Sequence, residues 1–478
     1  MNRFFLQVYG CQMNQYEAGV VRAVLAQAGF EETELEQDAD VLLMLTCAVR
    51  SHAEQRALGR LGAFRRLAGR GQGKTANGEW RMANGERRTA NFPRKVVGVL
   101  GCMSQNLKQA LADGRTADIV VGPDQYRRLP ELIEKARSDC ATVVALEQND
   151  ECYSDILPVA HGAPCGSVTV MRGCDNFCTY CIVPYVRGRE RSKETVQVLD
   201  EIRELVRKGV RDVTLLGQNV FAYRTEKDDF SSLLEQVSRV DGVERIRFLS
   251  PHPKDLTDRV LLAIARTPKV CPALHLPVQS GSNRILEMMK RGYTREEYLA
   301  RVVRARELMP ELGLTTDVMV GFPSETEEDF QDTLELVRTV RFDFAYMFRF
   351  SVRPGTAAAG FAPKVSEADS SRRLTRLIET QNRITRERNS GMVGRSFEAL
   401  VESESARGRA MLARTASNKA IVVSGGAAIG ETVACRVTGI KGWTPVAEVT
   451  GTMSNDELRI TNDGLRTARC VRRSSHVE

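Results

Sequence analysis

Short apolar runs alternate with segments of helical spacing along the first 150 residues. Three of these runs are FFLQVYG (4–10), VLLMLTC (41–47) and KVVGVLGC (95–102). Continuous Val and Leu runs of this length are typical of strands that are covered on both faces of a parallel sheet. Between the first two runs, Val20, Val21 and Val24 keep helical spacing and predict a crossover helix. The pattern predicts an N-terminal α/β domain with a parallel sheet over residues 1–147.

A second series of apolar runs follows between residues 167 and 350. It consists of SVTVMRG, DVTLLGQ, RIRFLSP, ALHLPVQ, TTDVMVGF and FAYMFRF. The segments between them are long enough for helices; one of them places Leu199, Ile202 and Val206 on one face and has Gly209 as a C-terminal cap. Six such units predict a (β/α)6 partial TIM barrel over 160–390. Ligands in parallel architectures gather at the carboxyl ends of the strands.

The C-terminal pattern predicts a smaller domain. Residues 371–390 hold six Arg against two Glu and predict a basic linker helix. Five short alternating segments then follow: SFEALVES, GRAMLART, KAIVVSG, ETVACRVTGI and TPVAEVTG. Together with their Gly and Asn turns they predict a small β-barrel over 391–453, followed by a polar tail over 454–478.

Residues 75–95 interrupt the α/β pattern. TANGEWR, MANGERR and TANFPRK are three approximate copies of a seven-residue unit, which raises the alternative of a heptad helix. Each copy lacks a pair of apolar residues, and the first two contain Asn-Gly turn signals. We therefore predict an exposed, disordered insertion.

Composition narrows the class of protein. The chain has 478 residues, of which 42% are hydrophobic and 27% charged, so it is long enough for a large core in several domains. No apolar run approaches the roughly 18 to 20 residues of a membrane span, and the N-terminus lacks the features of a secretory signal, so we expect a cytoplasmic protein. The net charge of +7 favours an acidic partner such as RNA without establishing one.

The twelve cysteines are candidates for metal ligation, because disulfides are rare in a reducing compartment. Cys174, Cys178 and Cys181, here called the central cysteine set, have C-x3-C-x2-C spacing directly after a predicted strand. A structural zinc site needs a fourth Cys or His, and none of the five histidines is near this loop. A cubane iron-sulfur cluster takes one thiolate per iron, so three thiolates would leave one iron open.

A second group of three cysteines, the N-terminal cysteine set, consists of Cys11, Cys47 and Cys102. Each follows a predicted strand, and parallel strands would bring them to one edge of the sheet. For any one of them, the alternative is a buried thiol that only packs.

The motif GCDNFCTYC, with Tyr180 in the aromatic place, resembles the signature of radical S-adenosylmethionine enzymes. The contexts GCQMN, TCAVR and GCMSQ extend the resemblance to the methylthiotransferase family over almost the whole chain. The resemblance implies two 4Fe-4S clusters, one on each cysteine set, and a C-terminal RNA-binding TRAM domain. It departs at Leu45, where family members commonly have Asn, and at the insertion over 75–95.

In that family the open iron of the central cluster binds S-adenosylmethionine, and its reductive cleavage gives a 5′-deoxyadenosyl radical. Ends of other barrel strands would then contact S-adenosylmethionine, although ordinary turn chemistry is the alternative at each. These candidates are Gly217, Gln218, Asn219, Gln279, Ser280 and Asp317, together with Tyr180. We expect no general acid or base, because an aromatic C–H bond is too weakly acidic for one.

The phrases CTYCIVPYVRGRERS and RFLSPHP resemble the branch that methylthiolates carbon 2 of N6-isopentenyladenosine beside the anticodon of tRNA, with two S-adenosylmethionine and a sulfur at the auxiliary, N-terminal cluster. Sister branches act on N6-threonylcarbamoyladenosine in tRNA or on an aspartate of a ribosomal protein. A non-catalytic iron-sulfur protein that binds RNA or transfers electrons is the alternative outside the family. The implied partners are tRNA, a reductant such as flavodoxin or ferredoxin, and a sulfur or cluster donor, and we expect a monomer that does not bind membranes.

Overall fold

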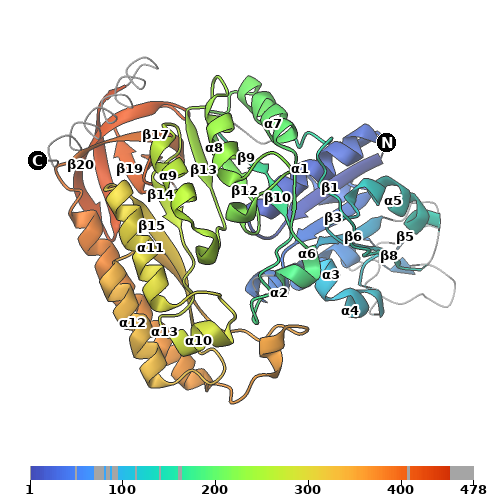
Figure 1. The fold of residues 1–478 in the computed structure, drawn as a ribbon. Helices are drawn as coiled ribbons and strands as arrows, with labels where there is room; N and C mark the ends of the chain where they lie inside the picture. Colours follow the sequence, from blue (N-terminus) through green and yellow to red (C-terminus); the bar gives the residue numbers. More distant parts are fainter. Residues whose placement is uncertain are drawn as a thin grey trace, which may run out of the picture.

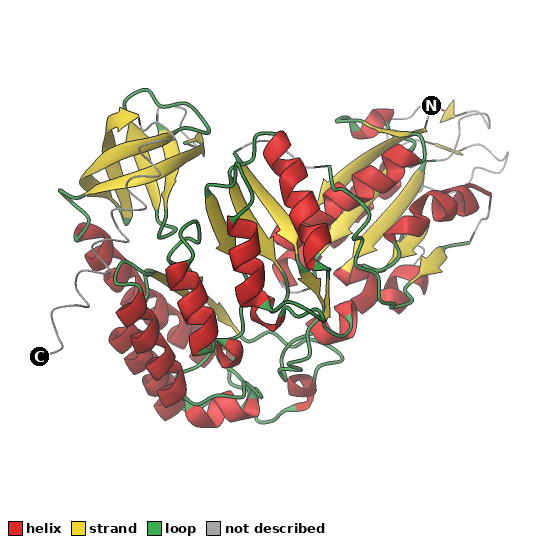
Figure 2. Cartoon of the chain, turned by 45° about the horizontal axis from the view of Figure 1, so that its top comes forward, coloured by secondary structure: helices red, strands yellow, loops and turns green. Residues whose placement is uncertain are grey.

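The computed structural model describes residues 2–48, 51–68, 80–81, 87–88, 95–113, 116–138, 141–159, 164–405 and 410–452. An N-terminal sheet, a central half-barrel and a C-terminal barrel follow one another along the chain (Figures 1 and 2). The predicted tail and most of the predicted insertion over 75–95 lie outside the described residues. Within the insertion, β4 (Trp80–Arg81) and β5 (Arg87–Arg88) form a short antiparallel pair.

The N-terminal sheet has six parallel strands in the order β2-β1-β3-β6-β7-β8. Its strands are β1 Asn2–Val8, β2 Phe30–Glu32, β3 Val41–Thr46, β6 Val96–Gly101, β7 Ile119–Val121 and β8 Val143–Ala145. The helices are α1 Gln12–Gln27, α2 Ser51–Leu67, α3 Cys102–Asn106, α4 Lys108–Asp113 and α5 Leu129–Ser138, with 3-10 turns η1 Glu36–Asp38 and η2 Tyr126–Arg128. The predicted α/β domain is confirmed, and β2, β7 and β8 are the strands that the pattern did not reveal.

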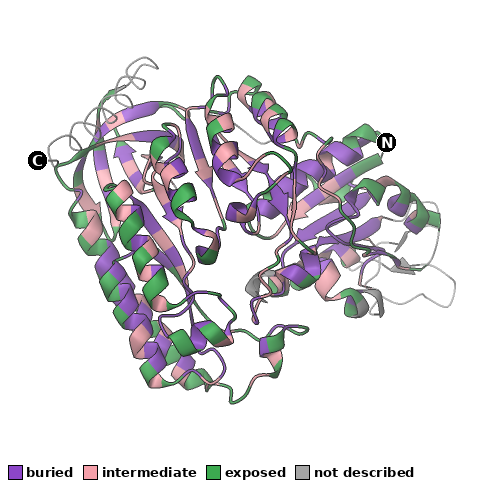
Figure 3. Ribbon diagram, viewed as in Figure 1, coloured by how far each residue is buried: buried purple, intermediate pink, exposed green. Residues whose placement is uncertain are grey.

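The central strands of this sheet are buried on both faces because helices cover both sides (Figure 3). Every residue of β3 and β6 is buried. Along β3, Leu43 and Leu45 pack on the side of α1, whereas Leu42 and Met44 pack on the side of α2. Two apolar faces explain why these strands appear in the sequence as uninterrupted apolar runs.

The central domain is the predicted (β/α)6 half-barrel. Its parallel strands are β9 Cys165–Thr169, β12 Asp212–Leu216, β13 Arg245–Phe248, β14 Ala273–His275, β15 Gly313–Val320 and β16 Phe344–Arg349. The helices that follow the strands are α7 Thr195–Arg207, α8 Phe230–Ser238, α9 Asp258–Arg266, α10 Asn283–Met288, α11 Arg295–Leu308, α12 Glu327–Val340 and α13 Glu367–Ser390. A parallel bridge between Ile246 and Val270 links its two three-stranded ladders.

Shorter elements complete this domain at the ends of the strands. They are β10 Met171–Arg172, α6 Val183–Arg187, β11 Arg191–Ser192, η3 Val220–Ala222, η4 Pro253–Asp255 and η5 Ala357–Gly360. One apolar core joins the half-barrel strands to the helices outside them, and Ile202 of α7 lies in it as its spacing predicts. The N-terminal domain packs beside β9 through α1, and Leu216 of β12 belongs to the N-terminal core.

The predicted basic linker helix is part of α13, and the structure corrects the role of its charge. Leu377 and Ile384 are buried in the barrel core. Arg373 pairs with Glu325 at 2.8 Å and Arg376 with Glu327 at 2.6 Å, and Arg388 pairs with Asp343. These ion pairs neutralise much of the charge that the sequence suggested for an RNA backbone, because α13 is a structural helix of the half-barrel.

The C-terminal domain is a closed five-stranded barrel, as predicted. It consists of β17 Ser396–Glu404, β18 Met411–Thr415, β19 Ala420–Ser424, β20 Thr432–Lys441 and β21 Thr444–Thr452. Alternating apolar residues, among them Val401, Ala413 and Val433, fill its interior. Across the part of the chain that the structure describes, no helix has both the length and the apolar character that crossing a membrane requires.

Candidate functional site

The N-terminal cysteine set gathers at one edge of the N-terminal sheet. Cys11 is the N-cap of α1, Cys47 follows β3, and Cys102 begins α3 directly after β6. Strands β1, β3 and β6 are neighbours and parallel, so their carboxyl ends meet at this edge. The predicted juxtaposition of the three cysteines on one sheet edge is therefore observed.

Close approach of the backbone shapes this edge. Gly101, which precedes Cys102, has φ of +93°, and a Cβ on it would lie 2.5 Å from the Thr46 carbonyl oxygen. Only glycine fits such a position without displacing the neighbouring strand. Asn14 spans the same edge: its Nδ2 donates to the Thr46 carbonyl at 3.0 Å, and its Oδ1 accepts from Cys11 Sγ at 3.3 Å.

The thiols of this set have different electrostatic environments. A hydrogen bond from Cys47 lowers the pKa of Cys11 to about 6, outweighing the desolvation of its sulfur, and the charge of Arg187 acts in the same direction. Burial raises the pKa of Cys102, while Arg187 opposes that shift. The guanidinium of Arg187 donates from Nε to Cys102 Sγ at 3.1 Å.

The central cysteine set lies in the loop between β10 and α6. Gly173 opens this loop with φ of +78°, where a Cβ would lie 1.8 Å from the Arg189 carbonyl oxygen. Cys181 donates its backbone N–H to the Cys178 carbonyl at 2.9 Å, which closes the turn. Burial and the neighbouring Cys178 raise the pKa of Cys181 to about 12. The loop thus folds three sulfur atoms into one small region.

Polar side chains from two other segments of the half-barrel lie next to the sulfur of Cys178. Arg291 is buried and donates from one nitrogen to Cys178 Sγ and to the Tyr180 hydroxyl, each at 3.3 Å. The Nε2 of His252 lies 3.9 Å from the same sulfur. Burial and nearby arginines hold the pKa of His252 far below its ordinary value, so this imidazole is neutral at physiological pH.

The three residues after β12 that we expected to contact S-adenosylmethionine lie beside the cysteine loop. Gln218 accepts the backbone N–H of Gly173 at 2.6 Å. Asn219 donates to Asp255 at 2.7 Å and accepts the backbone N–H of His252 at 3.0 Å. Gly217 lies against Met171, where a Cβ would come within 2.6 Å of that side chain. All three residues are at the carboxyl end of the strand, next to the loop.

The candidates on β14 and β15 divide into two kinds. Gln279 has φ of +71°, and its buried Oε1 has no hydrogen-bond partner among the described residues. Ser280 is fully buried, and its hydroxyl lies 3.3 Å from that of Thr333. Asp317 lies within β15, 3.5 Å from His275 Nε2 and inside the half-barrel. Gln279 thus has a buried side-chain oxygen without a partner among the described residues, which a ligand could supply.

Each cysteine set has a hydrogen-bond donor next to at least one of its sulfur atoms. No three Cys, His, Asp or Glu side chains among the described residues come close enough to hold one ion. A cubane instead takes one thiolate per iron, and its sulfur atoms accept hydrogen bonds from nearby donors. Cys174 has such a donor in Asn176 Nδ2 at 3.4 Å, as do Cys178 in Arg291 and Cys102 in Arg187.

A buried ion network connects the two cysteine sets. Glu17 of α1 accepts from Arg187 at 2.7 Å and from Arg172 at 3.0 Å, while Asp124 pairs with Arg191 at 2.5 Å and with Arg172 at 3.5 Å. We call these five residues the interdomain network. Arg172 lies just before the central cysteine set, and Arg187 lies just after it. The network therefore joins the N-terminal sheet to the cysteine loop.

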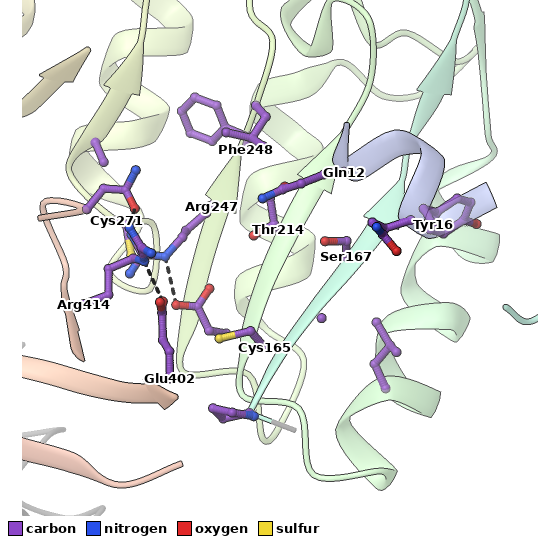
Figure 4. Close-up of a pocket in the computed structure, with 18 of the residues that line it drawn as sticks. Gln12, Tyr16, Cys165, Ser167, Thr214, Arg247, Phe248, Cys271, Glu402 and Arg414 are labelled. Atoms are coloured by element: carbon purple, nitrogen blue, oxygen red, sulfur yellow. Dashed lines mark hydrogen bonds and ion pairs between the residues drawn. The ribbon is translucent and has the colours of Figure 1, made fainter. Parts of the chain in front are cut away.

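A cavity of about 670 Å³ opens inside the half-barrel. Gln12, next to Cys11, lines it together with Ser167 and Thr214 from the barrel strands (Figure 4). Arg414 of the C-terminal barrel and Arg247 of β13 lie at its other side, where Arg247 donates to the Thr415 carbonyl at 3.1 Å. All three parts of the chain thus contribute to the walls of one cavity.

The sequence patterns did not single out Arg187, Arg291, His252, Glu17 or Asn14. Arg187 belongs to the phrase VPYVRGRE directly after Cys181, and this position was a usable signal. Glu17 and Arg291 had no comparable signal, because their roles arise from contacts between elements far apart in the chain.

Three family models match the chain. The model described as the radical SAM superfamily matches residues 168–337, the one described as "Uncharacterized protein family UPF0004" matches 3–122, and the TRAM domain model matches 391–450. These matches coincide with the half-barrel, the N-terminal sheet and the closed barrel.

Curated relatives match over nearly the whole length. A tRNA-2-methylthio-N(6)-dimethylallyladenosine synthase of Phocaeicola vulgatus is 42% identical over 445 residues, which cover 91% of this chain and 93% of the relative. A protein of the same name from Porphyromonas gingivalis is 41% identical and covers 95% of this chain and 96% of its own.

Among solved structures, the radical S-adenosylmethionine methyltransferase TsrM of Kitasatospora setae, with tryptophan and an S-adenosylmethionine analogue bound, has a TM-score of 0.56. It is 14% identical and covers 75% of each chain, so this likeness concerns the fold alone.

Proposed function

This chain belongs to the family of tRNA-2-methylthio-N(6)-dimethylallyladenosine synthases, and we propose that it attaches a methylthio group to carbon 2 of N6-isopentenyladenosine in tRNA. The observation that carries the proposal is the presence of two separate three-cysteine sets that are joined by one buried ion network. A single cluster site would serve radical formation alone. Two sites allow radical formation and sulfur delivery in the same enzyme.

We assign the ligands of two 4Fe-4S clusters to the two sets: Cys174, Cys178 and Cys181 for one, and Cys11, Cys47 and Cys102 for the other. When bound, the clusters and S-adenosylmethionine supply the radical that removes hydrogen from the substrate carbon and the sulfur that replaces it. Three protein thiolates in each set leave one coordination position for a ligand that the protein does not provide.

The residues around the central set have positioning roles in this proposal. Gln218 holds the start of the cysteine loop through Gly173, and Arg291 donates to Cys178 Sγ while it orients Tyr180. Hydrogen bonds to cluster sulfur stabilise the more reduced state. The free Oε1 of Gln279 is our candidate for a direct contact to S-adenosylmethionine. The assignment of Gly217, Asn219, Ser280 and Asp317 to that site rests on the family resemblance.

The cavity is our candidate for the place where the substrate nucleoside enters. Its walls come from the half-barrel, α1 and the C-terminal barrel, and Gln12, next to Cys11, is one of the lining residues. Fixed walls of this kind would hold the substrate carbon within reach of a sulfur at the N-terminal cysteine set.

The partners follow from the proposed reaction. The TRAM match over 391–450 and the names of the relatives support tRNA as the substrate. The reaction also needs a one-electron reductant, such as flavodoxin or ferredoxin, and a donor that restores the sulfur. We propose that the enzyme works as a monomer in the cytoplasm, where tRNA is available.

The reaction can be tested with the purified enzyme, reconstituted anaerobically and supplied with dithionite, S-adenosylmethionine and tRNA that carries N6-isopentenyladenosine. Nucleoside mass spectrometry should detect the 2-methylthio product, and 5′-deoxyadenosine should form alongside it. Transcripts that carry N6-threonylcarbamoyladenosine instead should remain unmodified. Modification of that nucleoside but not of the isopentenyl form would assign the chain to the sister reaction.

A further inference from the structure

The residue that contacts the N-terminal cysteine set most directly from the other domain is Arg187. It is the last residue of α6, which follows Cys181 of the central set, and its side chain crosses to Cys102. Only 4% of Arg187 is exposed. We propose that Arg187 is a positioning residue for the auxiliary cluster: its guanidinium donates to Cys102 Sγ, and its charge stabilises the more reduced cluster. This inference rests on the proposed assignment of Cys102 as a cluster ligand.

The geometry of the Arg187 side chain directs it at Cys102. An Nε–H to Sγ distance of 3.1 Å is a short contact for a sulfur acceptor, and the two terminal nitrogens of Arg187 are already fixed by Glu17 at 2.7 and 3.0 Å. These two hydrogen bonds fix the orientation of the guanidinium, so that its Nε–H points at the sulfur. A thiolate is a far better acceptor than a thiol, because a hydrogen bond to a charged group is about twice as strong.

The buried charges around Arg187 do not balance. The interdomain network contains three buried arginines and two buried carboxylates, Arg172, Arg187, Arg191, Glu17 and Asp124. The phenols of Tyr126 and Tyr153 also face it and are neutral, and Arg127 pairs with Glu151 and Asp155 at its rim. Among the described residues of this network, the three arginines thus exceed the two carboxylates by one positive charge. Buried charges require partners, and a cluster with three thiolates is anionic.

The cation and the cysteine that it contacts come from different domains. Cys102 belongs to the N-terminal sheet, whereas Arg187 belongs to the radical S-adenosylmethionine domain. The auxiliary cluster therefore reaches its full electrostatic environment only when the two domains are docked. Hydrogen bonds and positive charge next to cluster sulfur raise the reduction potential, because they favour the state with the extra electron.

The test uses the full-length chain with Cys174, Cys178 and Cys181 replaced by alanine, so that only the auxiliary cluster is present. Arg187→Gln and Arg172→Gln are compared in this background. Both variants remove one buried arginine that contacts Glu17, but only Arg187 donates to a cysteine sulfur. The midpoint potential of the cluster is measured by redox titration followed by visible absorbance and electron paramagnetic resonance.

We expect Arg187→Gln to shift the midpoint potential to a clearly more negative value and Arg172→Gln to shift it less. Glu17→Gln should shift the potential the opposite way, because it removes a negative charge beside Arg187. Arg187→Lys should give a value between those of the parent and Arg187→Gln, and it serves as the test if the glutamine variant does not fold. A merely structural role would move Arg187→Gln and Arg172→Gln alike.

Equal shifts in those two variants, or no shift in Arg187→Gln, would overturn the role of Arg187 and leave the two-cluster assignment intact. Failure of the parent triple-alanine protein to assemble any cluster would instead overturn the assignment of Cys102, and the inference with it.

Discussion

The two cysteine sets reach similar local chemistry by different routes. The central set comes from one continuous loop, and its sulfur atoms meet donors that lie on the same half-barrel, Asn176 and Arg291. The N-terminal set comes from three strand ends that are brought together by the parallel sheet, and its donor, Arg187, comes from another domain. The first site is encoded locally, whereas the second requires the whole sheet and the docked domain.

This difference extends to the acidity of the thiols. The pKa of Cys11 is lowered to about 6 by its hydrogen bond to Cys47, whereas burial raises that of Cys181 to about 12. Cys11 is also exposed, and it lies next to Gln12 in the cavity wall. The other five thiols are buried or half-buried, so Cys11 is the exposed member of the two sets. A thiol that is both exposed and acidic suits a site for repeated sulfur delivery.

We expect the largest effect from loss of the central cysteine set. Replacement of Cys174, Cys178 and Cys181 by alanine should abolish formation of 5′-deoxyadenosine and of the methylthio product. Iron should fall from about eight to about four per chain, because each cubane contains four irons. Iron analysis and chromatography of the reaction products check this. Loss of all iron would mean that the two sets do not bind separately.

Replacement of Cys11, Cys47 and Cys102 by alanine should give a different result. Reductive cleavage of S-adenosylmethionine should continue, because the central set is intact, whereas methylthiolation should stop. Assays for 5′-deoxyadenosine and for the methylthio product distinguish these outcomes. The variant without Cys174, Cys178 and Cys181 is the matched control. Continued methylthiolation would show that the sulfur does not come from this set.

We expect the interdomain network to contribute most to the stability of the contact between the N-terminal domain and the half-barrel. Glu17→Ala leaves Arg172 and Arg187 without their shared carboxylate, and removal of one partner from a buried ion pair costs about 3 to 5 kcal/mol. Urea unfolding at neutral pH measures this cost. Glu32→Ala, at the partly exposed pair with Arg22, is the control and should cost at most about 1 kcal/mol.

The same variant has a defined pH dependence. Burial acts to raise the pKa of Glu17, but Arg187 and Arg172 outweigh it, so that pKa is below its ordinary value of 4.5. A carboxyl with a lowered pKa in the folded state stabilises the protein above its ordinary pKa, and the stabilisation is lost as pH falls through the folded value. The free energy of unfolding of the wild type should therefore exceed that of Glu17→Ala by the whole of this amount at neutral pH. The excess should shrink below about pH 4.5. A difference that grows in acid would contradict this sign.

The smallest effects come from the two asparagines next to the cysteines. Asn14 is fully buried and bonds both the Thr46 carbonyl and Cys11, so Asn14→Ala should cost about 1 to 3 kcal/mol. Asn176 makes one long contact to Cys174 at its half-buried position, and Asn176→Ala should change stability by no more than about 0.5 kcal/mol. Thermal unfolding of the two variants without clusters measures how much stability each one loses. Equal losses would mean that the edge of the N-terminal sheet is held as loosely as the central loop.

The sequence predicted most of the fold because its strands are encoded by local patterns. All six strands of the half-barrel and β1, β3 and β6 follow from their apolar runs. The three-residue strands β2, β7 and β8 were missed, because they are too short for periodicity to register. Spacing along the chain also revealed the central cysteines, whereas the N-terminal set needed the assumption of parallel strands.

Sequence patterns could not reveal the partners of those cysteines. Arg291 contacts Cys178 across more than a hundred residues of chain, and Glu17 contacts Arg187 across an even longer separation. Such pairings depend on how domains dock, which no local pattern encodes. The arginines of α13 are the opposite case. In the sequence, Arg373 and Arg388 look available to bind RNA, but in the structure both are engaged in ion pairs.

The most direct test of the central claim is mass spectrometry of the tRNA nucleosides from cells that lack this gene. The account predicts that 2-methylthio-N6-isopentenyladenosine disappears while unmodified N6-isopentenyladenosine accumulates. Wild-type protein should restore the methylthio form, and the variant without Cys11, Cys47 and Cys102 should not. Persistence of the methylthio nucleoside in the cells that lack the gene, or its restoration by that variant, would contradict the account.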